Sequence, residues 1–125
     1  MIQAKKIKNL NLFTIKFPLP ALVSILHRMS GVFLFLLMPI LTISLWYSLI
    51  SEQYFLQVVS FFKLWPIKFI SLILIWGITH HILAGTRHLF LDLQLGLDLI
   101  TARFSSKTVL LVSFLITFLI SLSVW

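Results

Sequence analysis

Residues 67–91 read IKFISLILIWGITHHILAGTRHLFL and decide the fold. The stretch is mostly apolar, and a bilayer span needs about 20 such residues. On a helix that turns about 100° per residue, Gly85, His88 and Asp92 project within about 40° of His81. Ionisable side chains within a membrane are costly and face a protein interior, so this polar stripe is the first candidate for a functional site.

The composition identifies the whole chain as a membrane protein. Of its 125 residues, 60% are hydrophobic and 10% are charged, whereas soluble domains are typically about 45–50% apolar and about 25% charged. The length accommodates three spans and leaves no room for a soluble catalytic domain. The chain has no cysteine, which excludes disulfides, a thiol nucleophile and an iron–sulfur cluster held within this chain.

Two further apolar stretches complete an all-α integral membrane bundle of three helices, which we treat as one domain over residues 1–125. The expected segments are a basic cytoplasmic tail at 1–20 and spans at about 21–50, 67–91 and 108–125.

Pro39 lies inside the first span and should kink it. The short apolar stretch 54–62 is interpreted as an interfacial segment, and residues 92–107 as a polar connection.

Lysine and arginine residues favour a cytoplasmic N-terminus, because cytoplasmic loops carry an excess of both. With that orientation the inner side holds six of them and the outer connection two; these are Lys5, Lys6, Lys8, Lys16, Arg103 and Lys107 against Lys63 and Lys68. Membrane topology therefore explains the formal charge of +7, and no nucleic-acid partner is expected.

A second polar group opens the first span. Its offsets of three, four and seven residues place Ser24, His27, Arg28 and Gly31 on one helical face. Because consecutive spans are antiparallel, this group should lie at the same membrane surface as Asp92.

A neutral imidazole on a rigid helix is a good axial ligand for haem iron. His81 is the candidate, and Gly85 would leave room for a flat macrocycle; His80 points about 100° away from the stripe and is the weaker candidate. The structural alternatives stay open: His81 bonds a neighbouring helix, and Gly85 is a small-residue helix contact.

The polar groups near the surface suit anionic and carbonyl ligands. Arg28, His27 and His88 can hold propionates by charge-assisted hydrogen bonds, and Ser24 and Arg28 can bind a quinone carbonyl opposite Asp92. Alternatively, Arg28 is a snorkelling topology anchor and Ser24 bonds its own backbone. Asp92 can also end the helix or pair with Arg87.

Two strings carry a family resemblance. Residues 24–31 read SILHRMSG, and residues 81–88 read HILAGTRH and are followed by Asp92. They resemble the S-x-x-H-R-x-S-G and H-x-x-x-G-x-R-H-x-x-x-D motifs of the cytochrome b556 membrane-anchor subunits of succinate dehydrogenase. An Arg-Pro pair that often precedes the first span in that family is absent here, and the third span carries no diagnostic residue.

The resemblance implies a role for each matching residue. His81 corresponds to the axial haem ligand and so holds the haem iron, and Ser24 and Arg28 correspond to the ubiquinone-contacting pair. The surroundings of haem and quinone would be lined by four more residues, His27, Arg87, His88 and Asp92.

The resemblance also implies a haem b shared with a second small anchor subunit, and an iron–sulfur and a flavoprotein subunit on the inner face. Electrons from succinate would then reach ubiquinone in the lipid bilayer. The alternatives are a fumarate reductase anchor, a haem-free structural anchor and a small proton-coupled transporter. Because no Arg- and Ser-rich transit peptide precedes the first motif, a cell inner membrane is favoured over a mitochondrial one.

Overall fold

The computed structural model describes residues 17–124, which form four helices and no strand. These helices are α1 (Leu19–Ser48), α2 (Glu52–Phe62), α3 (Trp65–Asp92) and α4 (Leu99–Val124). The three long helices are each apolar and long enough to cross a membrane, which confirms the predicted all-α, three-span fold. Most of the basic tail expected at 1–20 lies outside the described residues.

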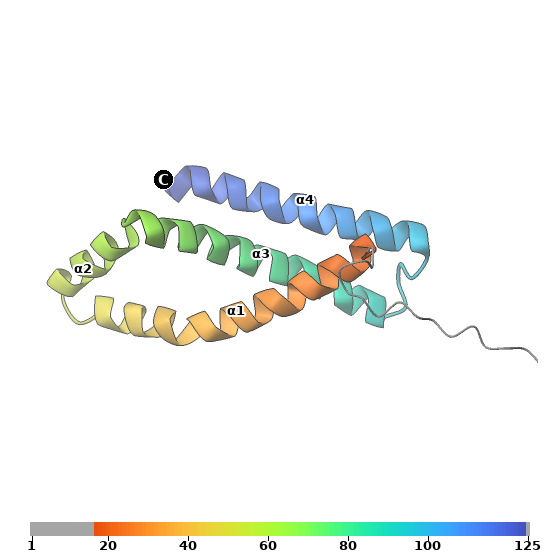
Figure 1. Ribbon diagram of the computed structural model, residues 1–125. Helices are drawn as coiled ribbons and strands as arrows, with labels where there is room; N and C mark the ends of the chain where they lie inside the picture. The colour runs from red at the N-terminus through yellow and green to blue at the C-terminus, as the bar shows by residue number, and fades with distance from the viewer. Residues whose placement is uncertain (1–16, 125) are drawn as a thin grey trace, which may run out of the picture.

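Helix α3 is the middle of the bundle and packs against both α1 and α4, while α2 joins the far ends of α1 and α3 (Figure 1). Helices α1 and α3 run antiparallel, and so do α3 and α4. The start of α1, the end of α3 and the start of α4 therefore lie together, and we call this end of the bundle the turn end. The predicted kink is visible as a bend of α1 (Figure 1), which contains Pro39.

Prolines set the starts of the two predicted spans that the sequence located best. Pro20 lies in the first turn of α1, behind the extended Pro18, and Pro66 lies in the first turn of α3. Proline is well placed there, because the first turn of a helix has no intrahelical acceptor for its N–H groups. Both helices begin two residues before the predicted spans at 21 and 67.

The end of α3 is closed by backbone hydrogen bonds rather than by glycine. The N–H of Leu95 donates to the carbonyl of Phe90 at 3.0 Å and the N–H of Gln94 to that of Leu91 at 3.0 Å. This is the Schellman pattern, which needs a left-handed residue after the helix, and Gln94 adopts it with φ of 63°. Glycine usually fills this position, so the sequence offered no clear stop signal.

The polar connection predicted at 92–107 is wrong over its second half, because α4 begins at Leu99. Asp98 provides the start: its Oδ2 accepts the N–H of Thr101 at 2.8 Å, and its carbonyl accepts the N–H of Ala102 at 2.9 Å. An aspartate at this position stabilises the first turn of the helix, because it accepts an N–H that has no acceptor within the helix. The segment expected at 54–62 is the short helix α2, capped by Ser51, whose side chain accepts the N–H of Tyr54 at 3.4 Å.

The bundle interior is made of small and polar residues, while large apolar side chains face outward. The fully or nearly buried positions of α3 and α4 include Gly77, Ala84, Ser106, Ser113 and Thr117. Small residues let membrane helices approach closely, since lipid offers no hydrophobic drive for their association. The three hydroxyls bond carbonyls of their own helix, so none is left unsatisfied.

Candidate functional site

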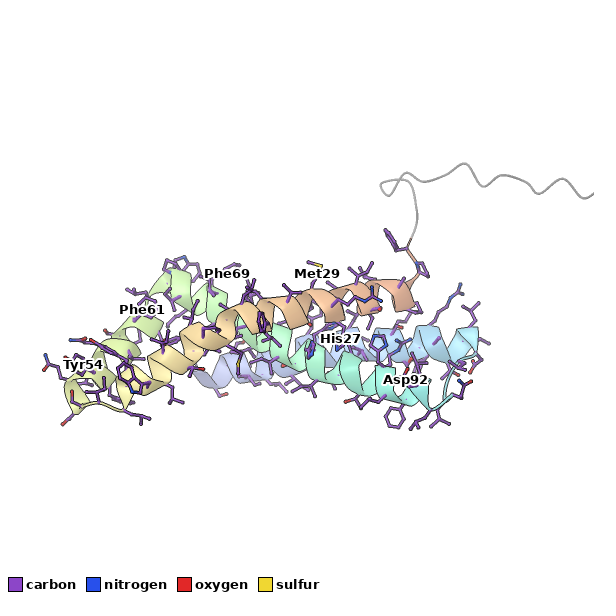
Figure 2. The ribbon with its side chains drawn as sticks, turned by 90° about the horizontal axis from the view of Figure 1, so that it is seen from below. His27, Met29, Tyr54, Phe61, Phe69 and Asp92 are labelled. Carbon is purple, nitrogen blue, oxygen red and sulfur yellow. The ribbon has the colours of Figure 1, made fainter. Side chains whose placement is uncertain are left out.

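Three histidines from two helices meet between α1 and α3. The ring of His27 on α1 stacks on that of His81 on α3, with centroids 4.2 Å apart and planes 17° apart. The ring of His88 lies 5.1 Å from that of His27, at a tilt of 49°. All three are partly buried, and Figure 2 shows His27 between the two helices. The histidines of the two predicted polar groups therefore form one cluster.

The two ring nitrogens of His81 have different surroundings. Nδ1 lies 3.1 Å from Oγ of Ser30 and 3.2 Å from the carbonyl oxygen of His27. Ser30 already donates its hydroxyl hydrogen to that same carbonyl at 2.8 Å, so both neighbours of Nδ1 present acceptor lone pairs. Nδ1 therefore carries the proton in the neutral ring. Nε2 makes no hydrogen bond to any described residue, and its lone pair is free.

Glycines allow the histidine rings to lie against the opposite helix. A Cβ on Gly31 would be 3.0 Å from Cε1 of His81, and one on Gly85 would be 3.2 Å from Nε2 of His27. Both distances are shorter than an ordinary van der Waals contact. Gly85 was expected to leave room for a macrocycle, yet the space beside it holds the His27 ring. This geometry favours the small-residue contact between helices.

His80 does not join the histidine cluster and is completely buried. Its ring stacks on Trp76 with centroids 5.0 Å apart, and it lies close to the backbone of Val23. Neither of its ring nitrogens makes a hydrogen bond of acceptable geometry, and the same is true of the indole nitrogen of Trp76. The adjacent histidines thus have different surroundings, in agreement with the separation of about 100° between successive helical positions.

Arg87 is buried against α4, not in the histidine cluster. Its Nε donates to Oγ of Ser105 at 3.0 Å and its guanidinium Nη2 to the carbonyl of Ala102 at 3.3 Å. No ion pair with Asp92 forms within residues 17–124, so the pairing weighed from the sequence is not observed. Sequence reasoning missed these two α4 partners because it placed both in the polar connection at 92–107.

Ser24, Arg28 and Asp92 lie near the turn end. Arg28 and Asp92 are exposed and Ser24 is partly buried, and Figure 2 shows Asp92 at the end of α3. Among the described residues none of the three makes a hydrogen bond. In particular, the Ser24 hydroxyl does not bond its own helix, as Ser30 does at 2.8 Å. The Ser24 hydroxyl therefore has no partner among the described residues and can bind a ligand or a partner chain.

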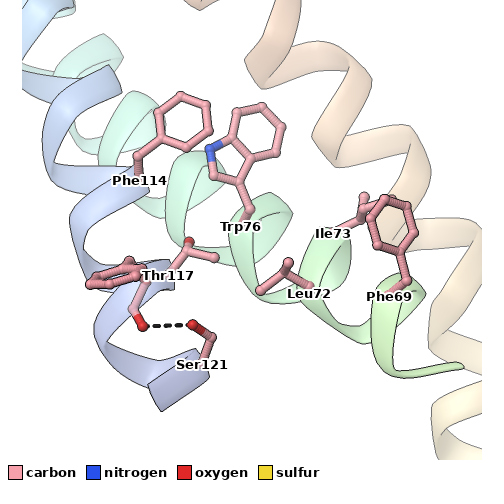
Figure 3. A pocket seen from close by; sticks show the side chains of 8 residues that line it. Phe69, Leu72, Ile73, Trp76, Phe114, Thr117 and Ser121 are labelled. Carbon is pink, nitrogen blue, oxygen red and sulfur yellow. Dashed lines mark hydrogen bonds between the residues drawn. The ribbon is translucent and has the colours of Figure 1, made fainter. Parts of the chain in front are cut away.

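Two grooves flank the contact between α3 and α4. One, of about 510 Å³, is shown in Figure 3, with Trp76 and Phe114 at one end and Phe69 at the other; its wall also includes Ser121, whose hydroxyl bonds the carbonyl of Phe118 at 2.6 Å. The second, of about 460 Å³, is lined by Arg87 and the turn after α3. Neither groove is lined by the histidine cluster or by Ser24 and Arg28, so both are separate from the predicted site.

Comparison with known proteins agrees with the motifs. Residues 3–120 match the succinate dehydrogenase/fumarate reductase transmembrane subunit family. A succinate dehydrogenase cytochrome b556 subunit from Coxiella burnetii is 35% identical over 126 residues, which cover 99% of this chain and 100% of the relative. The chain belongs to the succinate dehydrogenase/fumarate reductase transmembrane subunit family, as a multi-pass protein of the inner membrane.

Proposed function

We propose that this chain anchors a succinate dehydrogenase complex, supplies one axial ligand of a b-type haem and forms part of a ubiquinone site. The name of the Coxiella burnetii relative, a cytochrome b556 subunit, supports a haem of this type. The partners would be a second small anchor subunit that shares the haem, an iron–sulfur subunit and a flavoprotein subunit. Succinate oxidation would take place on these partners and not on this chain.

The observation that carries the haem assignment is the state of His81. A histidine that ligates a metal usually donates its other ring N–H to a carbonyl or polar side chain, which fixes the tautomer and the ring orientation. His81 has this arrangement, since Nδ1 contacts Ser30 and the His27 carbonyl while Nε2 makes no hydrogen bond to a described residue. His80 does not, because it is completely buried and neither of its ring nitrogens has a hydrogen-bond partner. A bound haem would supply one-electron transfer.

Ser24 and Arg28 would bind the quinone. The Ser24 hydroxyl and the Arg28 guanidinium have no hydrogen-bond partner within residues 17–124 and can donate to a quinone carbonyl at the turn end. Charge-assisted bonds from arginine are the stronger of the two. Asp92 is exposed at the same end and can exchange protons with water. With the N-terminus inside, as the basic residues predict, this end faces the cytoplasm and the soluble subunits.

The test is made on the purified complex. We expect His81→Ala to abolish the b-type signal in reduced-minus-oxidised spectra, while His80→Ala retains it. Co-purification of the soluble subunits serves as the control for assembly in both variants. An unchanged spectrum in an assembled His81→Ala complex would remove the haem assignment and leave a structural anchor.

The family description covers fumarate reductase as well, so the reverse direction is the second candidate. Initial rates of the same complex with succinate and quinone, and with fumarate and quinol, distinguish the two. We expect the first pair to be faster.

A further inference from the structure

The second half of the first motif, Ser30 and Gly31, has no role in the proposed function so far. Ser30 is 5% exposed and lies one turn beyond His27 on α1. Its hydroxyl hydrogen is directed to the His27 carbonyl at 2.8 Å. The oxygen of this hydroxyl therefore has a lone pair available, and its neighbour on α3 is Nδ1 of His81 at 3.1 Å.

Ser30 is the better of the two acceptors for this N–H. The His27 carbonyl lies slightly farther from Nδ1, at 3.2 Å, and it already accepts the Ser30 hydroxyl. As the carbonyl of an α-helix residue it is also an acceptor within α1. The Ser30 oxygen has no other donor among the described residues. Both groups favour the Nδ1-protonated ring. Among the described residues, the Ser30 oxygen has His81 as its only donor, whereas the His27 carbonyl is shared with the Ser30 hydroxyl.

Gly31 leaves the space that the imidazole ring of His81 occupies. The Cβ of any other residue at this position would lie 3.0 Å from Cε1 of His81. Since α1 backbone stands on one side of that contact and the histidine ring on the other, a side chain could be placed only by moving the ring or separating the helices. Close approach of a backbone to a ring is a reason for glycine at a helical position that would otherwise disfavour it.

We propose that Ser30 is a positioning residue for His81: it accepts Nδ1–H, fixes the tautomer and orientation of the ring, and directs Nε2 to the haem iron, while Gly31 makes room for the ring. This inference rests on the proposed role of His81 as haem ligand. Outer partners of ligating histidines raise the basicity of the ligand, and their loss typically costs about 10–100-fold in metal affinity.

The helix itself provides a matched control. Ser44 is also on α1, and its hydroxyl donates to a carbonyl of its own helix at 2.8 Å, but it makes no hydrogen bond to another described helix. If Ser30 acted only through its bond within α1, Ser30→Ala and Ser44→Ala would behave alike. If it positions His81, only the first substitution changes the haem.

The experiment uses the assembled complex, with haem content per flavin, haem retention under dilution, and the midpoint potential from a redox titration. We expect Ser30→Ala to weaken haem retention by about 10–100-fold and to shift the potential upward, because a less basic imidazole stabilises the oxidised iron less. Ser44→Ala should match the unsubstituted complex in all three. Equal retention and equal potential in Ser30→Ala would overturn the inference.

An isosteric pair keeps the test decisive if Ser30→Ala does not assemble. Ser30→Thr retains the hydroxyl, and Ser30→Val has the same shape without it. We expect the threonine variant to keep the potential and the valine variant to shift it upward; identical potentials in the two would overturn the inference.

His81→Ala, measured in parallel, separates the two proposals. If it keeps the b-type signal, the haem assignment and the positioning role both fail. If it loses the signal while the Ser30 variants are unchanged, only the positioning role fails.

Discussion

The two faces of α3 differ in what they hold. The face toward α1 carries His81 and His88, whose rings are partly buried and reach across to His27. The second face carries His80 and Arg87, both buried. Arg87 donates hydrogen bonds to α4, whereas His80 stacks on Trp76 and has no hydrogen bond. On the first face, Nε2 of His81 has no hydrogen bond to a described residue, while Nδ1 contacts Ser30 and the His27 carbonyl. On the second face, the polar side chains of His80 and Arg87 are buried. Chemistry is thus expected on one face and helix packing on the other.

The largest difference is expected between the leucine substitutions of the two adjacent histidines. We expect His81→Leu to eliminate the haem signal and His80→Leu to leave it intact. His80 has two buried nitrogens without hydrogen bonds, and replacing such a group by an apolar one of similar size is close to neutral or stabilising. Spectra and thermal unfolding of the complex measure the two effects. Loss of haem from His80→Leu in a complex of normal thermal stability would break the comparison.

The next effect concerns the quinone and the guanidinium of Arg28, which is exposed and has no hydrogen bond to a described residue. We expect Arg28→Ala to lower quinone reductase activity by at least roughly tenfold, equivalent to about 1.4 kcal/mol, while succinate oxidation with an artificial acceptor is retained. Arg103→Ala, a substitution of an exposed arginine on α4, is the matched control and should change neither rate. An equal loss of both activities in Arg28→Ala would indicate an assembly role.

A smaller effect is expected from the packed face alone. Ser105→Ala removes the side-chain acceptor of Arg87, whose Nε lies 3.0 Å from the serine oxygen. Hydrogen bonds to charged groups are worth about 1.5–3 kcal/mol, and part of this should remain because the Ala102 carbonyl is still in place. Thermal unfolding should occur at a lower temperature, with haem content and potential unchanged. A shift of the haem potential by Ser105→Ala would show that the two faces are coupled.

The smallest effect is expected at the start of α4. The Thr101 backbone N–H donates to Asp98, and this holds the pKa of the Asp98 carboxyl below its ordinary value. A lowered pKa means that the carboxylate stabilises the folded state above its ordinary pKa, and that this stabilisation is lost as the pH falls through the lowered value.

Asp98→Ala should therefore be less thermally stable than the unsubstituted protein at neutral pH, with a difference that shrinks in acid. Asp98→Asn keeps a capping oxygen and should differ from Asp98→Ala by an amount that does not depend on pH. A pH-independent difference between Asp98 and Ala at this position would contradict the capping role.

The sequence predicted the fold well because few signals were needed. Long apolar stretches identify spans, and Pro20 and Pro66 located the starts of two helices to within two residues. The start of α4 was missed because Asp98 and the polar residues after it were interpreted as a loop. The end of α3 carries Gln94 at a left-handed position, where glycine would have been the visible signal.

The candidate site was predicted in part. Helical spacing correctly separated His81 from His80 and joined His81 with His88, because successive positions on a helix are rotated by a constant angle. It could not show that the His27 ring would occupy the space at Gly85, or that Ser30 would contact Nδ1. Those contacts depend on the distance and rotation between two helices, which no single helix encodes.

The sequence by itself determined that this protein crosses the membrane three times and which polar residues share a helical face. Hydropathy and the fixed turn of the α-helix are local properties, so neighbouring residues suffice to specify them. Only the tertiary structure decided that Arg87 turns to α4 while His81 turns to α1. It also decided that Nδ1 of His81 contacts Ser30 while Nε2 has no hydrogen-bond partner among residues 17–124. These outcomes depend on close contact between helices at glycine and serine positions, where a single methyl group changes which side chain can approach.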